Sequence, residues 1–116
     1  MTIAITGGLI SEWAKVSGNT ATTVFTANRK TLIVSIAVTP TSGTPSLTIA
    51  RYDGTSRYNR RTAVAMTAGT AYVDENPFVL DNEDTIEITS SSATGDMDVC
   101  VTYVSPEAAA NVRISN

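Results

Sequence analysis

Hydrophobic and polar positions alternate along most of the chain with a period close to two, which is the pattern of β-strands. The strongest example is the segment Leu32–Val38, where large apolar side chains occupy the even-numbered positions and Ser35 and Ala37 lie between them. The segment Met97–Tyr103 likewise places its large side chains on one face. We therefore expect a protein built of strands, with Leu32–Val38 in the centre of a packed sheet.

Turn signals divide this pattern at intervals of about 8 to 15 residues, which is typical of sandwiches and small barrels. Asp53-Gly54 predicts a tight hairpin, because both residues tolerate a positive φ at low cost. We predict an all-β, jelly-roll-like β-sandwich of about eight strands. An immunoglobulin-like sandwich is the second interpretation. It ranks below the jelly roll because the Cys–Trp–Cys pattern of the immunoglobulin fold is absent.

The C-terminal segment departs from the strand pattern. Ser105–Asn111 combines an N-cap residue, a proline at the first helical position and good helix formers. The segment is too short for a stable isolated helix, so we expect a short helical turn or an arm. The predicted division is a sandwich domain over residues 1–104 and a C-terminal turn or arm over residues 105–116.

Composition argues against catalysis. The chain of 116 residues contains no histidine, which removes the commonest general base and the commonest zinc ligand. Its single cysteine, Cys100, lies inside a predicted strand and is expected to be packed rather than reactive. We expect no enzyme activity and no cofactor. No segment reaches the roughly 18 to 20 apolar residues of a membrane span, so no membrane contact is expected.

The acidic corner Asp81–Asp84 is the one candidate for a metal site. Its carboxylates could supply oxygen ligands to Ca²⁺, but the spacing is not that of an EF-hand loop. Acidic corners of this kind commonly precede strands and are solvated. We therefore expect no metal, with calcium as the alternative.

Basic residues gather in the predicted hairpin and become rare after it. The hairpin contains half of the 8 lysines and arginines, and residues 62–112 contain none, although they include many acids. Arginine and tyrosine are enriched at protein interfaces. We therefore predict a partner-binding surface formed by Arg51, Arg57, Tyr58, Arg60 and Arg61. A solvated hairpin is the plain alternative. Nucleic-acid binding is the third, and the net charge of −3 opposes it.

The chain resembles the small virion proteins of tailed bacteriophages, especially capsid decoration (cement) proteins. The resemblance lies in a Thr-, Ser- and Ala-rich all-β unit without histidine, and in the stretches Thr31–Thr39 and Phe78–Ile88. It implies a non-enzymatic protein of the virion that is assembled in the host cytoplasm and stabilises the head. The implied partners are the major capsid protein or another virion protein, together with further copies of the chain in a homo-oligomer such as a trimer.

Two other functions remain open at this point. A phage tail or fibre module has the same composition. A carbohydrate- or receptor-binding sandwich would need exposed aromatic side chains, and the candidates are Trp13, Tyr52, Tyr58 and Tyr72.

Overall fold

The computed structural model describes residues 2–5, 8–91, 96–104 and 112–115, and every regular element in these ranges is a β-strand. The strands are β1 (Thr2–Ile5), β2 (Leu9–Ser17), β3 (Thr22–Thr26), β4 (Thr31–Pro40), β5 (Ser46–Tyr52), β6 (Arg57–Ala65), β7 (Tyr72–Asp74), β8 (Phe78–Leu80), β9 (Thr85–Ser90), β10 (Asp96–Val104) and β11 (Val112–Ser115). The described residues hold no helix that could span a membrane.

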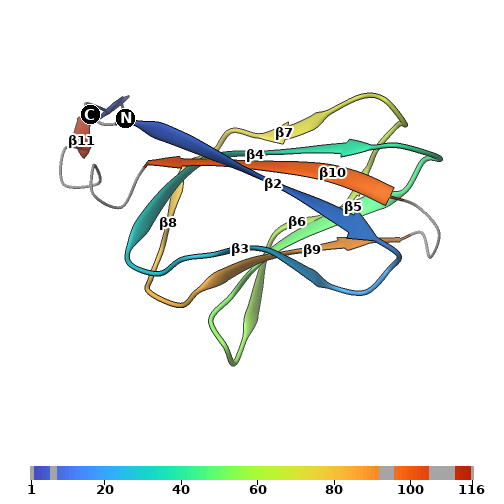
Figure 1. Cartoon of the computed structure of the whole chain (residues 1–116), viewed down its shortest axis with the longest axis horizontal. Coiled ribbons are helices and arrows are strands. Elements are labelled where there is room, and N and C mark those ends of the chain that lie inside the picture. The colour runs from blue at the N-terminus through green and yellow to red at the C-terminus, as the bar shows by residue number, and fades with distance from the viewer. Residues whose placement is uncertain (1, 6–7, 92–95, 105–111, 116) are drawn as a thin grey trace.

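Two antiparallel sheets face each other (Figure 1). One has the order β2-β10-β4-β7, with β8 also on β4, and we call it the β2 sheet; the other has the order β3-β9-β5-β6. Strands β7 and β8 pair with different parts of β4, so they share one position in the sheet. The sandwich therefore has four strand positions in each sheet, and the prediction of about eight strands is confirmed.

The path of the chain is that of a jelly roll. From β2 to β10 the chain crosses from one sheet to the other at every connection between sheet positions except the β5–β6 hairpin. As a result, strands far apart in the sequence become neighbours, and β10 lies between β2 and β4. The predicted all-β, jelly-roll-like architecture is confirmed.

The core lies between the sheets and is built by alternation along the central strands. Met97, Val99 and Val101 of β10 have no exposed surface, and Tyr103 is also buried. The ring of Phe25 packs at 4.8 Å from that of Tyr103, which joins the two sheets. The predicted inner face of Met97–Tyr103 is therefore confirmed.

The centre of β4 differs from the sequence prediction. The strand is central as predicted, but its register with β10 shifts so that Thr102 faces Ser35 while Tyr103 faces Ile33. The extra residue, Val34, interrupts the alternation, because a bulge places two residues of one strand opposite one of its partner. Ile33 consequently turns into the core together with Ile36, although strict alternation predicted opposite faces for them.

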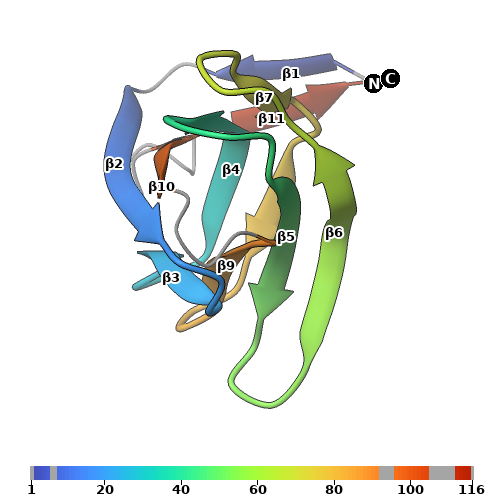
Figure 2. The ribbon, with the colours of Figure 1, turned by 90° about the vertical axis from the view of Figure 1, so that its right-hand side faces the viewer.

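A third, two-stranded sheet pairs β1 with β11, so that Thr2 lies opposite Ser115. This pairing brings the two described ends of the chain side by side (Figures 1 and 2). The predicted helical turn at Ser105–Asn111 lies outside the described residues. The β5–β6 hairpin extends beyond the other loops (Figure 2).

Candidate interaction surfaces

The hairpin between β5 and β6 is closed by a turn over residues 53–56. The amide N–H of Asp53 donates to the carbonyl of Ser56 over 3.2 Å, and Gly54 has a φ of 95°. The carboxylate of Asp53 accepts the amide N–H groups of Ser56 and Thr55 at 2.7 and 2.9 Å. These hydrogen bonds lower the pKa of Asp53 below its usual value. The predicted Asp-Gly hairpin is present.

Arg57 lies on the sheet face that points away from the core. Its Nε donates to Oε1 of Glu87 over 2.5 Å, and its guanidinium lies 4.4 Å above the centre of the Tyr52 ring. The hydrogen bond to Glu87 raises the pKa of Arg57 above its ordinary value. Tyr58 alternates with Arg57 and so faces the other way, with 54% of its surface exposed.

Arg51 ties the hairpin to the acidic corner. Its Nε and terminal nitrogen donate to Oδ2 of Asp84 over 2.9 and 2.6 Å, and the terminal nitrogen also reaches Asp81 at 3.3 Å. The hydrogen bond to Asp84 raises the pKa of Arg51. The same oxygen of Asp84 accepts the amide N–H of Asp81 over 3.0 Å. The candidate calcium corner is therefore engaged with an arginine, and within the described ranges no three metal-ligating side chains gather.

Arg60 and Arg61 both reach the buried carboxylate of Asp74 on β7. The distances are 3.3 Å from Arg60 Nε and 3.2 Å from a terminal nitrogen of Arg61. Consecutive strand residues normally point to opposite faces, but Ile49 faces Arg61 while Ala50 faces Asn59, so Arg60 is a bulge residue. The bulge turns both arginines toward one carboxylate and so joins the edges of the two sheets.

Three further contacts fix these arginines. Arg60 also donates to the carbonyl of Asn76 over 2.8 Å and lies 3.7 Å above the Phe78 ring. Arg61 Nε donates to the hydroxyl of Tyr72 over 2.9 Å. Both side chains are thus held from several directions along the junction of β6 with β7 and β8.

The separation of charges along the sequence is not kept in space around the hairpin. Each of the four predicted arginines is paired with a carboxylate from residues 74–87, a segment that follows the hairpin in sequence. The sequence shows the two groups of charges but not that the fold places one on the other. Arg51, Arg60 and Arg61 hold the hairpin to the body, and Arg57 and Tyr58 are the more exposed members of the predicted surface.

A second surface covers the outer face and free edge of the β2 sheet. Three of the six exposed large hydrophobic side chains among the described residues lie on β2, namely Leu9, Ile10 and Trp13. Trp13 has 74% of its surface exposed. The strand registers continue from Trp13 through Cys100 and Ala37 to Val73, which forms an apolar row across the outer face.

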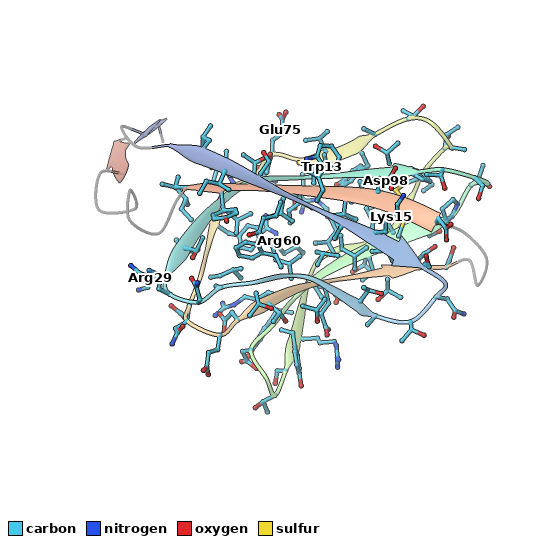
Figure 3. The ribbon with its side chains drawn as sticks, viewed as in Figure 1. Trp13, Lys15, Arg29, Arg60, Glu75 and Asp98 are labelled. Atoms are coloured by element: carbon cyan, nitrogen blue, oxygen red, sulfur yellow. The ribbon has the colours of Figure 1, made fainter. Side chains whose placement is uncertain are left out.

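A shallow hollow of about 330 Å³ lies beside Trp13 and is lined by Trp13, Ala14, Lys15 and Asp98. Figure 3 shows Trp13, Lys15 and Asp98 close together along β2 and its neighbour β10. The Lys15 ammonium lies 2.8 Å from the Asp98 carboxylate, and this hydrogen bond raises the pKa of Lys15. From the sequence, Trp13 was predicted only as one of four candidate exposed aromatic side chains. The signal for this surface was a tryptophan among the polar positions of an alternating strand.

Fold and surfaces together define a small jelly-roll β-sandwich with two candidate interaction surfaces. No protein-family model matches the sequence, and no curated protein is similar to it in sequence. Solved structures share the fold. A chain of the acid-stable capsid of Helicobacter pylori bacteriophage KHP30 matches with a TM-score of 0.62 and 7% identity, over 90% of this chain and 93% of that chain.

Two other solved structures are similar. A chain of the cyanophage Pam1 capsid asymmetric unit matches with a TM-score of 0.56 and 20% identity, over 86% of each chain. A chain of the Bacillus endospore appendages, described as disulfide-linked pili, matches with a TM-score of 0.50 and 18% identity, over 82% of this chain and 85% of that chain. At these identities the likeness is one of fold.

Proposed function

We propose that the chain is a non-enzymatic structural protein of a bacteriophage virion, of the capsid decoration (cement) type that stabilises the head. The observation that carries this proposal is the match to a chain of a phage capsid over nearly the full length of both chains. A jelly roll of this size, standing as a separate chain, is thus a component of at least one such structure. The proposed location is the virion, after assembly in the host cytoplasm.

The proposed partners are the major capsid protein or another virion protein, and further copies of the chain in a trimer. The hairpin is the proposed contact with the capsid. Arg57 and Tyr58 would contact the partner from opposite faces of the hairpin, and Arg51, Arg60 and Arg61 would hold the hairpin in position. An arginine whose charge is already paired adds rigidity to a contact, because less side-chain freedom is lost on binding. No cofactor or metal has a part in this function.

Co-sedimentation with undecorated capsids tests the proposal. We expect the parent protein to bind, and Tyr58→Ala to weaken binding roughly tenfold or more if Tyr58 is a central contact. Arg57→Glu should also weaken binding, with a thermal melt to show that the hairpin still folds beside Glu87. Arg29→Glu is the matched control, because it makes the same charge change at an exposed loop outside the hairpin. Parent protein that stays in the supernatant would contradict the capsid role.

A carbohydrate- or receptor-binding module is the second candidate. The observation that favours it is the exposed Trp13 beside a hollow with one ammonium and one carboxylate group. An aromatic face with adjacent polar groups suits a ligand that presents both C–H and O–H groups. A panel of soluble glycans, read by the fluorescence of Trp13, the single tryptophan of the chain, distinguishes this function from capsid binding.

A further inference from the structure

Strand β2 has the properties of an edge that is available for pairing. It contains 9 residues and, among the described strands, pairs only with β10. The backbone N–H and C=O groups on its other side are a ready template for another strand. Proteins usually protect such edges with prolines, bulges or charges. Strand β2 has no proline, pairs with β10 through nine consecutive residues without a shift, and carries only Glu12 and Lys15 as charges.

We propose that β2 pairs antiparallel with β2 of a second copy, around a two-fold axis perpendicular to the sheet. The two β2 sheets would then form one continuous sheet across the dimer. An axis in this direction keeps the outer face of one copy on the same side as the outer face of the other. Outer-face residues therefore pair only with outer-face residues, which limits the registers that are allowed.

Charge and overlap select one register. An axis at Glu12 would place two Glu12 carboxylates opposite each other, which is destabilising. An axis at Ala14 would leave Leu9 and Ile10 beyond the paired region. An axis at Trp13 pairs all 9 residues of the strand and opposes no like charges. In this register each Trp13 lies opposite its symmetry mate, and aromatic pairs of this kind stabilise antiparallel strands.

The neighbouring rows of side chains agree with the Trp13 register. Ser11 would lie opposite Lys15 of the second copy. Within one copy, Ser11 is already 3.1 Å from the Thr102 hydroxyl, and Lys15 is 2.8 Å from Asp98. The Ser11–Thr102 row of one copy would thus meet the Lys15–Asp98 row of the other. The Lys15 ammonium group can then donate a hydrogen bond to the Ser11 hydroxyl. The apolar row through Trp13 and Cys100 would continue across the axis into the same row of the second copy.

A second copy accounts for more of this surface than a sugar does. A sugar in the hollow would cover Trp13 but would leave in water Leu9, Ile10 and the edge of β2 with which no described strand pairs. Strand pairing covers the ring, the adjacent apolar side chains and the backbone groups together. This pairing is a property of the chain alone, so it does not depend on the capsid role, and it is distinct from the three-fold contact of the proposed trimer.

Analytical ultracentrifugation of the purified chain over a concentration series tests the pairing. Protein concentrations up to about 1 mM would reveal even a weak dimer with a Kd of about 1 mM. We expect a monomer–dimer equilibrium and a blue shift of Trp13 fluorescence as the dimer forms. Trp13→Lys places two ammonium groups at the axis and should weaken association roughly tenfold or more. Val73→Lys changes an exposed apolar residue on the same face but on β7, and should leave association unchanged.

Cysteine cross-linking tests the register. In a Cys100→Ser background, Trp13→Cys should form a disulfide-linked dimer, because directly opposite Cα atoms are about 4.5 to 5.5 Å apart, within disulfide range. Ser11→Cys and Lys15→Cys should each fail to cross-link alone and should cross-link when mixed. A monomer at every concentration, association insensitive to Trp13→Lys, or a different cross-linking pattern would each overturn the proposal. Any of these results leaves capsid co-sedimentation as a separate question.

Discussion

At the scale of single residues, Asp74 is the side chain that connects the edges of the two sheets. Its side chain has no exposed surface and accepts hydrogen bonds from Arg60, Arg61 and the amide N–H of Asn76. A buried carboxylate is stable in such a place only when its charge is compensated, and the two arginines supply this compensation. Asp74 in turn compensates the charges of Arg60 and Arg61, because both guanidinium groups pair with this carboxylate.

We predict that Asp74→Ala lowers the free energy of unfolding by about 2 to 4 kcal/mol. Removal of one member of a fully buried pair costs about 3 to 5 kcal/mol, and the partial exposure of both arginines reduces this value. Urea unfolding at neutral pH measures the change. Asp96→Ala is the control, since Asp96 is exposed, and it should stay within about 0.5 kcal/mol. Equal stabilities of the two variants would mean that the arginines do not depend on Asp74.

At the scale of elements, the hairpin owes its shape to one glycine. Gly54 has a φ of 95°, which side-chain-bearing residues rarely adopt. Apart from Gly54 and its two chain neighbours, no residue has an atom within 4 Å of the position that its Cβ would occupy. A substitution there tests backbone strain alone, without a steric clash.

We predict that Gly54→Ala destabilises the protein by about 1 to 2 kcal/mol, the cost of holding a residue with a Cβ in this region. Thermal unfolding followed by circular dichroism measures the change. Gly8→Ala is matched to it, because Gly8 is also exposed and has open space around it but no positive φ. The control should lose no stability. If both variants melt like the parent, the turn can adopt another conformation at little cost.

The elements themselves were largely predictable, and their exceptions have a local cause. Alternation predicted the inner face of β10, and the Asp53-Gly54 turn signal predicted the hairpin, because both features depend on residues adjacent in sequence. Alternation failed at Val34, where a bulge in β4 changes the phase. A bulge adds one residue without any distinctive side chain, so a pattern of hydrophobic positions does not reveal it.

The candidate site depends on contacts between residues far apart in the sequence, and a local pattern of side chains does not show such contacts. The cluster of arginines was visible, but its pairing with Asp74, Asp84 and Glu87 follows from the path of the jelly roll. The exposed edge at Trp13 likewise follows from the position of β2 at the end of its sheet. Neither the arginine pairing nor the edge position of β2 has a signature in neighbouring residues, although Trp13 itself stands among the polar positions of its strand.

At the scale of the whole molecule, β10 should be essential for folding. It lies between β2 and β4, so its removal would leave β2 without its partner strand. We predict that a chain ending at Ser91 does not fold, whereas a chain ending at Val104 keeps a cooperative thermal transition. Circular dichroism of both truncations measures this difference. An unfolded chain of residues 1–104 would contradict the proposed division into a sandwich domain and a C-terminal arm.

The pairing of β1 with β11 has a practical consequence for protein engineering. Because Thr2 lies opposite Ser115, a short flexible linker can join the two ends into a circular backbone. New termini can then be opened at the tip of the β5–β6 hairpin, between Asp53 and Ser56. Such a circular permutant would carry fused cargo at the projecting hairpin instead of beside the third sheet, so the two geometries of display can be compared on one scaffold.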